Sequence, residues 1–205
     1  MKDSDIVFYV NNFKYLESSA DSKIDFVPVI LRRRMSKMDK CLLSVLNNVF
    51  TPETENIVFS SQYGEVERLL KIIEQYTKNN EVSPNMFSGS VHNFAIGFYL
   101  LNIKKTIPYT ALAACENSIS AGFLSSVIAN YNNNIFCYAD ICGEDFISMA
   151  VNITKIPQPG SCKFVLKPVP NSGLQDNFKD YTEFFSGMKT KLDTSLFSIE
   201  RGSND

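Results

Sequence analysis

Two side chains of this sequence have the chemistry for covalent catalysis: Cys115 and His92, which is the one histidine of the chain. A thiol becomes a strong nucleophile when it loses its proton, and a neighbouring imidazole can accept that proton. A pair formed by Cys115 and His92 would suit an acyltransferase or a thioesterase. Spacing along the chain does not decide whether the two side chains meet in space, so this hypothesis stays open at the level of sequence.

The residues around Cys115 predict a sharp turn between a strand and a helix. Residues 108–114 are small and apolar, as in a buried strand, and residues 118–129 have a helical pattern. A thiol at a helix N-terminus is favoured in its ionised form, which would support catalysis. Glu116, however, follows the thiol directly, and a neighbouring carboxylate opposes its ionisation. A sharp strand-to-helix turn that presents a catalytic nucleophile is called a nucleophile elbow. We interpret Cys115 and Glu116 as a vestigial elbow of this kind and predict no catalytic residue in the chain.

Composition indicates one ordinary globular domain over residues 1–205. Apolar residues make up 44% of the chain and charged residues 20%, and this length can bury a sizeable core. A net charge of -2 argues against nucleic-acid binding, which usually needs a basic face. No apolar run approaches the ~20 residues that span a bilayer, and the N-terminal run is too short for a signal peptide.

Cysteine usage favours a reduced compartment. The five cysteines are odd in number and most lie in apolar runs, so free thiols fit better than a disulfide framework. Their spacing does not match a zinc site, and a lone histidine is a poor fourth ligand. We predict a cytoplasmic protein without a metal or another cofactor.

Strand-like and helix-like segments alternate along the chain. Short apolar runs at residues 6–10, 57–59, 108–114, 135–139 and 163–166 predict strands, without the alternation typical of a half-exposed sheet. Ser36, with Asp39 three places on, predicts the capped start of a helix. Further helices are predicted at residues 65–76, 91–101, 118–129 and 176–191. This order predicts an α/β layered domain with a mixed, mostly parallel sheet and helices on its faces.

Four blocks in order carry a family resemblance: residues 26–36, 57–65, 83–93 and 110–114. Over residues 25–150 the chain resembles the N-terminal half of the ketoacyl synthases, and most of all the short chain-length factors of aryl-polyene biosynthesis. The resemblance implies a thiolase-like half-domain. Decarboxylating condensing enzymes need a cysteine and two histidines, which a chain with one histidine does not supply.

The resemblance therefore implies a partner rather than an enzyme in its own right. A chain-length factor pairs with an active ketosynthase and bounds the tunnel that holds the growing acyl chain, in type II polyketide or fatty-acid-like synthesis. The partner brings the nucleophile and the histidines, and the substrate is carried on acyl carrier protein. A Cys115-dependent acyltransferase or thioesterase, or a self-associating scaffold, are the alternatives.

The resemblance also implies where the functional surfaces lie. Residues expected to bound the partner's tunnel are Arg68, Leu69, Ile72, Ile73, Phe87 and Phe94. Residues expected at the subunit interface are His92, Asn93, Pro108, Tyr109, Thr110, Ala111 and Leu112, with the strand at 108–113 pairing across the axis. The run Arg32-Arg33-Arg34 could steer an acidic carrier protein, or it could be a solvated or interface surface.

Overall fold

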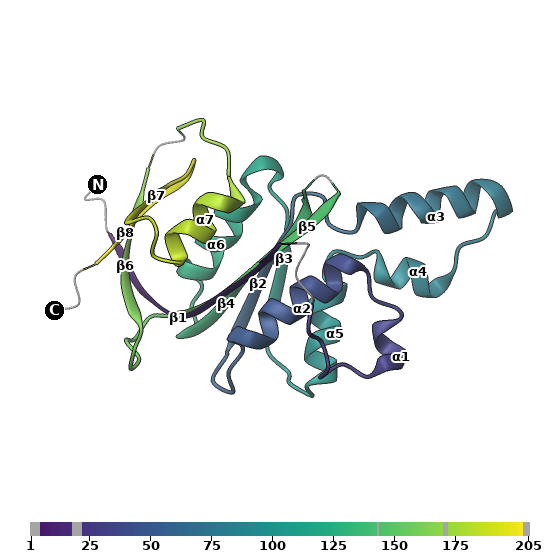
Figure 1. The fold of residues 1–205 in the computed structure, drawn as a ribbon, viewed down its shortest axis with the longest axis horizontal. Helices are drawn as coiled ribbons and strands as arrows, with labels where there is room; N and C mark the ends of the chain where they lie inside the picture. The colour runs from purple at the N-terminus through teal and green to yellow at the C-terminus, as the bar shows by residue number, and fades with distance from the viewer. Residues whose placement is uncertain (1–4, 18–21, 143, 170–171, 203–205) are drawn as a thin grey trace.

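The computed structural model describes residues 5–17, 22–142, 144–169 and 172–202. These residues form one sheet of eight strands, with helices on both of its faces (Figure 1). The strands are β1 (Ile6–Glu17), β2 (Asn56–Ser60), β3 (Tyr109–Leu112), β4 (Asn133–Cys142), β5 (Asp145–Thr154), β6 (Cys162–Pro168), β7 (Lys191–Asp193) and β8 (Phe197–Arg201). The helices are α1 (Val29–Arg32), α2 (Lys37–Val49), α3 (Val66–Asn79), α4 (Pro84–Gly89), α5 (Phe94–Asn102), the 3-10 turn η1 (Cys115–Asn117), α6 (Ser118–Ile128) and α7 (Phe178–Phe185).

Strand order in the sheet is β3-β2-β4-β5-β1-β6-β8-β7. The prediction of a mixed sheet is confirmed, but the expectation that it is mostly parallel is wrong. Only the pairs β2–β3 and β2–β4 are parallel, whereas the other five pairings of the described strands are antiparallel. A parallel connection needs a crossover of a dozen or more residues, and helical crossovers join only β2, β3 and β4. The link between β4 and β5 is too short for one.

Two cores lie on opposite faces of the sheet, and β4 contributes to both. Ile135, Cys137 and Ala139 belong to the core under α2 and α5. Phe136 and Tyr138 belong to the core under α6 and α7. Because side chains of a strand alternate between faces, covering both faces requires a continuous apolar run. This requirement explains why the strand sequences lack a period of two.

Local signals account for two helix boundaries. Ser36 and Asp39 form the predicted capping box of α2, with Asp39 N donating to Ser36 Oγ at 2.9 Å and Ser36 N donating to Asp39 Oδ2 at 3.0 Å. The helix predicted at residues 176–191 is shorter than expected. It ends at Phe185, because Gly187 turns the chain with a φ of 83° into β7.

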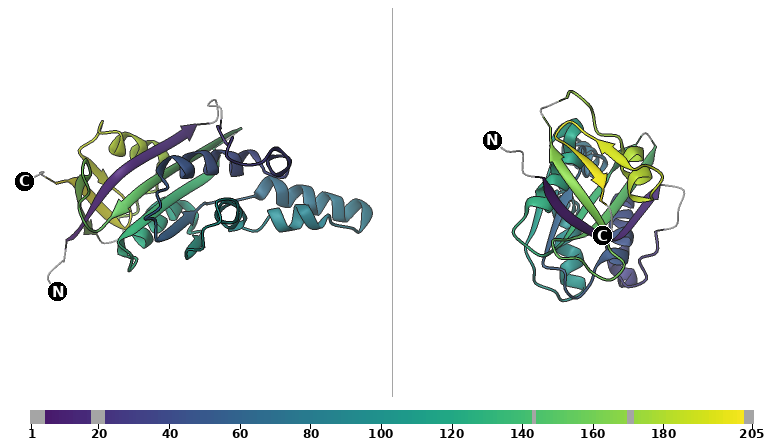
Figure 2. Two further views of the ribbon diagram at one scale, coloured as in Figure 1. Left: turned by 90° about the horizontal axis from the view of Figure 1, so that it is seen from below. Right: turned by 90° about the vertical axis from the view of Figure 1, so that its left-hand side faces the viewer.

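Helices α3 and α4 lie outside both helical layers and project from the body of the molecule (Figures 1 and 2). We call residues 66–89 the arm. Asn80 ends α3 in the left-handed conformation, with a φ of 53°, and Pro84 begins α4. Of the residues of α3 only Ile72 is buried, so most of the apolar side chains of this helix are not covered by the chain itself. None of the described helices is both long enough and apolar enough to cross a bilayer.

Candidate functional site

Cys115 lies at the sharp turn between β3 and α6. Its side chain is exposed, and its backbone has a φ of 49°, which is rare for a residue with a Cβ atom. A strained turn of this kind between a strand and a helix presents a side chain in the way that a nucleophile elbow does. The structure thus places the thiol where the sequence predicted the turn.

His92 does not pair with Cys115. Its Nε2 lies 2.7 Å from Ser61 Oγ, and its ring packs on Phe59 with 5.0 Å between centroids. Burial lowers the pKa of His92, and the charge of Asp140 only partly opposes this shift. His92 and Cys115 line two different hollows of the surface. The histidine therefore fastens the end of β2 to the start of α5, and the thiol has no imidazole beside it.

The hollow that contains Cys115 has a volume of about 420 Å³. Its charged lining consists of Glu116 and Asp176, and the described residues contribute no lysine, arginine or histidine to it. Glu116 Oε2 accepts a hydrogen bond of 2.6 Å from Gln175 Nε2, so the C-terminal part of the chain holds this carboxylate at the hollow that Cys115 also lines. No group of three or more potential metal ligands occurs within the described ranges.

Strand β3 forms one edge of the sheet and pairs only with β2 among the described strands. The carbonyl groups of Pro108 and Leu112 accept hydrogen bonds from Ile57 N and Ser61 N of β2. Because alternate residues of a strand direct their backbone groups to opposite sides, the N–H and C=O of Ala111 face away from β2. This edge can therefore accept a further strand.

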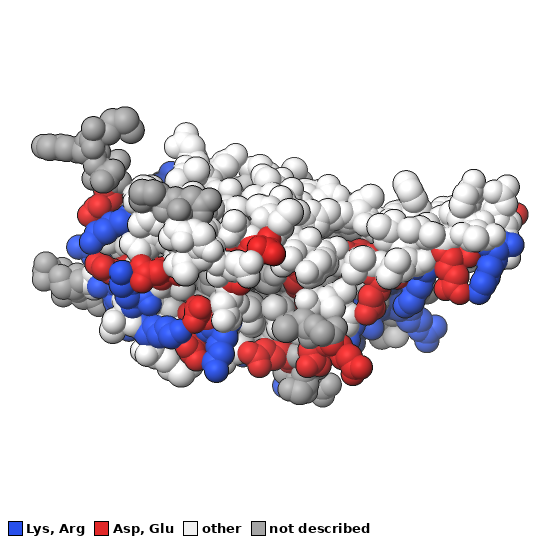
Figure 3. Space-filling model, turned by 90° about the horizontal axis from the view of Figure 1, so that it is seen from above, with Lys and Arg blue, Asp and Glu red and all other residues white. Residues whose placement is uncertain are grey.

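An apolar surface covers the arm beside this edge. Leu69, Leu70, Ile73, Tyr76 and Phe87, which we call the arm surface, are all exposed, with Phe87 at 62%. A groove of about 580 Å³ runs between α3 and α4. Figure 3 shows that one side of the molecule carries few charged side chains from the body out onto the arm, whereas charges gather along the other side. Exposed apolar surfaces of this extent mark interaction sites.

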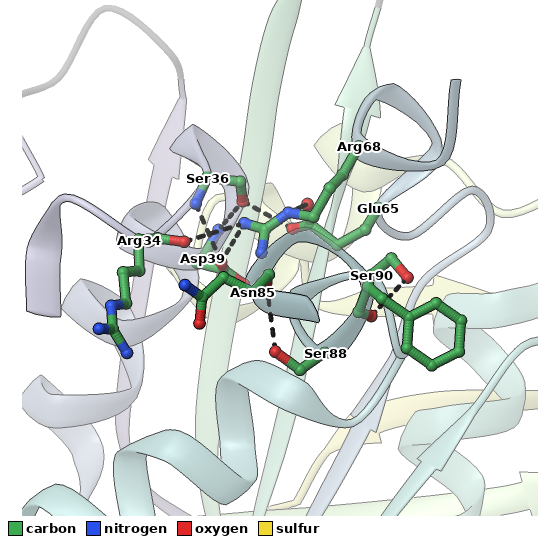
Figure 4. Close-up of polar contacts among 9 residues, drawn as sticks. Arg34, Ser36, Asp39, Glu65, Arg68, Asn85, Ser88 and Ser90 are labelled. Carbon is green, nitrogen blue, oxygen red and sulfur yellow. Dashed lines mark hydrogen bonds and ion pairs between the residues drawn. The ribbon is translucent and has the colours of Figure 1, made fainter. Parts of the chain in front are cut away.

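A buried polar cluster fixes the base of the arm (Figure 4). The Arg68 guanidinium contacts Asp39 Oδ2 at 3.1 Å and Glu65 Oε2 at 3.2 Å. Ser36 Oγ donates to Glu65 Oε1 at 2.6 Å. Burial, together with the charge of Glu65, raises the pKa of Asp39 to about 7. One guanidinium thus holds two carboxylates between α2 and α3.

The residues expected to bound a tunnel therefore separate into two groups. Leu69, Ile73 and Phe87 are exposed on the arm. Ile72 is buried, and Arg68 lies over the ring of Phe94 at 5.7 Å at the base of the arm. Sequence reasoning missed the cluster around Arg68, although the spacing of Glu65 and Arg68, three apart at a helix start, is an ion-pair signal.

The residues expected at the interface also differ in their exposure. Asn93, Pro108 and Thr110 are exposed, whereas Tyr109, Ala111 and Leu112 are half-buried. His92 is half-buried too, and its Nε2 faces Ser61 inside the fold.

The arginine run does not act as one patch. Arg32 pairs with Asp25 at 3.0 Å, whereas Arg33 and Arg34 are exposed. Arg33 and Arg34 line a hollow of about 520 Å³ with Lys37 and Lys71. Within the described ranges none of these four cations has a carboxylate partner at ion-pair distance.

Comparison of the sequence with known protein families identifies the family to which this chain belongs. Residues 10–142 match the family described as beta-ketoacyl synthase, N-terminal domain. The chain belongs to this beta-ketoacyl synthase family. The match covers the elbow, the arm and the parallel strands, and it confirms the resemblance inferred from the four sequence blocks.

Solved structures confirm the thiolase-like fold of this ketoacyl-synthase chain. A structure of the ketosynthase ApeO in complex with its chain length factor ApeC, from Xenorhabdus doucetiae, aligns with a TM-score of 0.73 at 16% identity. That alignment covers 96% of this chain and 100% of the matched chain. The ishigamide ketosynthase/chain length factor aligns with a TM-score of 0.54 at 12% identity, over 68% of this chain and 50% of that one. No curated protein sequence matches the chain.

Proposed function

We propose that this ketoacyl-synthase-like chain is a non-catalytic, chain-length-factor-like subunit that pairs with an active ketosynthase. The observation that carries the proposal is the uncovered arm surface next to the unpaired edge of β3. Leu69 of the arm and Ala113, directly after β3, line the same small hollow, so the two features form one continuous region. A partner that covers this region would remove a large apolar surface from water.

Two observations favour a subunit without its own chemistry. Cys115 has the backbone conformation of a nucleophile elbow. The one histidine of the chain, however, contacts Ser61 and not Cys115. Nucleophilic catalysis by a thiol needs a base within hydrogen-bond reach. The partner would supply the nucleophile and the histidines.

The arm would bound the partner's acyl tunnel. Leu69, Ile73 and Phe87 are exposed and free to contact another subunit, whereas Arg68 and Phe94 hold the arm at its base. Bulk at the end of a packed cavity opposes the entry of further methylene groups by about 1–3 kcal/mol. We assign the gating role to the first three residues and a supporting role to Arg68, Ile72 and Phe94.

Edge strand β3 would pair with the equivalent strand of the ketosynthase. Ala111 presents its backbone groups outward, and Thr110 is exposed beside it. Pairing of two edge strands would continue the sheet across the subunit axis and satisfy these groups.

The substrate would be an acyl chain on acyl carrier protein, in cytoplasmic aryl-polyene or related polyketide synthesis. Carrier proteins of this kind are acidic, and Arg33, Arg34, Lys37 and Lys71 offer four cations without carboxylate partners in the described structure. Complementary charge would steer such a carrier to the base of the arm.

Co-expression with the ketosynthase encoded nearest to this chain tests the proposal. Size-exclusion chromatography and native mass measurement are expected to show a stable one-to-one complex, and poor recovery of this chain alone. A monomer that ignores the ketosynthase would overturn the proposal, and a homodimer that ignores it would favour a self-associating scaffold. Condensation of acyl- and malonyl-carrier substrates by the purified chain alone would contradict the non-catalytic assignment.

A further inference from the structure

The N-terminus of α6 already holds a negative charge from a distant part of the chain. Asp176 Oδ2 accepts a hydrogen bond of 2.7 Å from Ser120 N in the first turn of α6. Tyr181, which is buried, donates its hydroxyl hydrogen to Asp176 Oδ1 at 3.1 Å. The carboxylate is therefore clamped between two helices that lie 50 residues or more apart in sequence.

Further bonds tie the elbow to the same C-terminal segment. Asp176 N donates to the carbonyl of Glu116 at 3.3 Å, and Gln175 Nε2 holds the Glu116 carboxylate at 2.6 Å. Ser195 Oγ donates to Asn117 Oδ1 at 2.9 Å. The segment that supplies these contacts follows the family match, which ends at residue 142.

We propose that Asp176 and Glu116 silence Cys115 by placing two fixed carboxylates at the helix end and in the hollow where an active elbow would collect negative charge. A free helix N-terminus attracts anions and favours a thiolate. Here Asp176 offsets the charge of the helix end, and Glu116 repels an anion that enters the hollow lined by Cys115. The hollow that they line contains no cation from the described residues to offset them.

The inference rests on the proposed non-catalytic role and gives it a mechanism. The carboxylates around the exposed thiol then act together with the lack of a neighbouring base to prevent catalysis. The hollow around Cys115 would reject carboxylate-bearing substrates, because like charges repel.

Alkylation of the isolated chain by two reagents tests the inference without a ketosynthase. Iodoacetamide is neutral and iodoacetate is an anion, but in both cases the thiolate forms a C–S bond as iodide leaves. The ratio of the two rate constants at Cys115 reports the local charge. Mass spectrometry assigns the modified residue, and Cys115→Ser corrects for the other cysteines.

The variants are Asp176→Asn, Glu116→Gln and the double substitution, measured at about pH 8, well above the usual range of carboxyl groups, because burial raises the pKa of Asp176. Asn can still accept the bond from Ser120, so the substitution removes charge and keeps shape. We expect the iodoacetate-to-iodoacetamide ratio to rise at least about fivefold in the double variant, which is the effect of one unit charge about 4 Å away when water screens it fully. Asp180→Asn on α7 makes the same charge change outside the hollow and should leave the ratio unchanged.

An unchanged ratio in the folded double variant would overturn the inference. If Asp176→Asn does not fold, Glu116→Gln alone still decides, because Glu116 is exposed and its substitution leaves the half-buried Asp176 carboxylate in place. Formation of the ketosynthase complex is a separate measurement, so either proposal can fail without the other.

Discussion

The guanidinium of Arg68 lies so close to Gly89 that an added Cβ at position 89 would overlap Arg68 Nη1. The missing Cβ of Gly89 therefore makes room for the guanidinium of the ion-pair cluster at the base of the arm. This contact joins α4 to the cluster that already links α2 and α3, so one side chain fixes the arm to the body.

Substitution of Gly89 by Ala should destabilise the chain. The new methyl group would displace Arg68 from Asp39 and Glu65, and would leave buried carboxylates without their cation. Breaking a buried ion pair in this way costs about 3 kcal/mol. Urea unfolding measures the change, with Ser88→Ala as the control, since Ser88 is exposed on the same helix. Equal stabilities of the two variants would contradict the role assigned to Gly89.

Because the pKa of Asp39 is raised on folding, this group should make the folded chain less stable as pH rises. Its pKa is about 7 in the folded chain and about 3.9 when unfolded, so between these values the folded chain holds the extra proton. The contribution of this group to the free energy of unfolding is therefore full below about pH 4 and decreases as pH rises to about 7. The slope is at most about 1.4 kcal/mol per pH unit.

Asp39→Asn removes this titration and keeps an oxygen acceptor for Ser36 and Arg68. Relative to the natural chain, the variant should gain stability as pH rises from about 5 to about 7 and no further above that. Urea unfolding of both proteins across this range provides the measurement. Ser88→Ala, an exposed substitution that involves no titratable group, should show a flat difference. A flat difference for Asp39→Asn as well would disprove the assignment.

Much of the local structure could be predicted from the sequence because its signals are local. The capping box of Ser36 and Asp39, the turn at Asn80 and the turn before α6 depend on residues close together in the chain. The family resemblance, carried by four blocks, gave the fold class.

The rest depends on contacts between distant segments. Ser61 meets His92, and Asp176 meets Ser120, across 31 and 56 positions, and no periodicity encodes such pairs. Strands β5, β7 and β8 were missed for a related reason. The apolar run of β5 is interrupted by buried polar side chains, and β5 pairs with β1 from the other end of the sequence.

Charge on the arm surface should prevent association with the ketosynthase. Phe87→Glu places a carboxylate on an exposed apolar site, so the chain should fold normally. Loss of one buried aromatic contact and burial of a charge should weaken the complex at least about tenfold. Titration of the two subunits by calorimetry measures the affinity. Lys78→Glu, an exposed change on the same arm at a lysine that pairs with Glu74, also adds negative charge and is the control. Equal affinities for both variants would remove the arm from the interface.

A proline at position 111 tests the edge strand separately from the arm. Ala111→Pro removes an N–H that faces away from β2, so the bonds of β2 to Pro108 and Leu112 remain. We expect near-normal stability of the chain alone and loss of the one-to-one complex in size-exclusion chromatography. Persistence of the complex would mean that β3 does not pair with the partner.

The titration of His92 can be followed directly by NMR, because the two carbon-bound imidazole protons of the one histidine are not overlapped by those of another. Burial against Phe59 disfavours the imidazolium, and the charge of Asp140 opposes this only in part, so the pKa of His92 lies below its usual value. The unfolded chain then binds a proton first as pH falls. Stability from this group is therefore present above about pH 6.5 and is lost as the solution is acidified through the folded pKa. The titration midpoint in the folded chain should be lower than in the same chain unfolded by concentrated urea. A midpoint equal to or above that reference would mean that His92 is solvated or paired with a carboxylate, and it would reopen a role for the imidazole beyond holding Ser61.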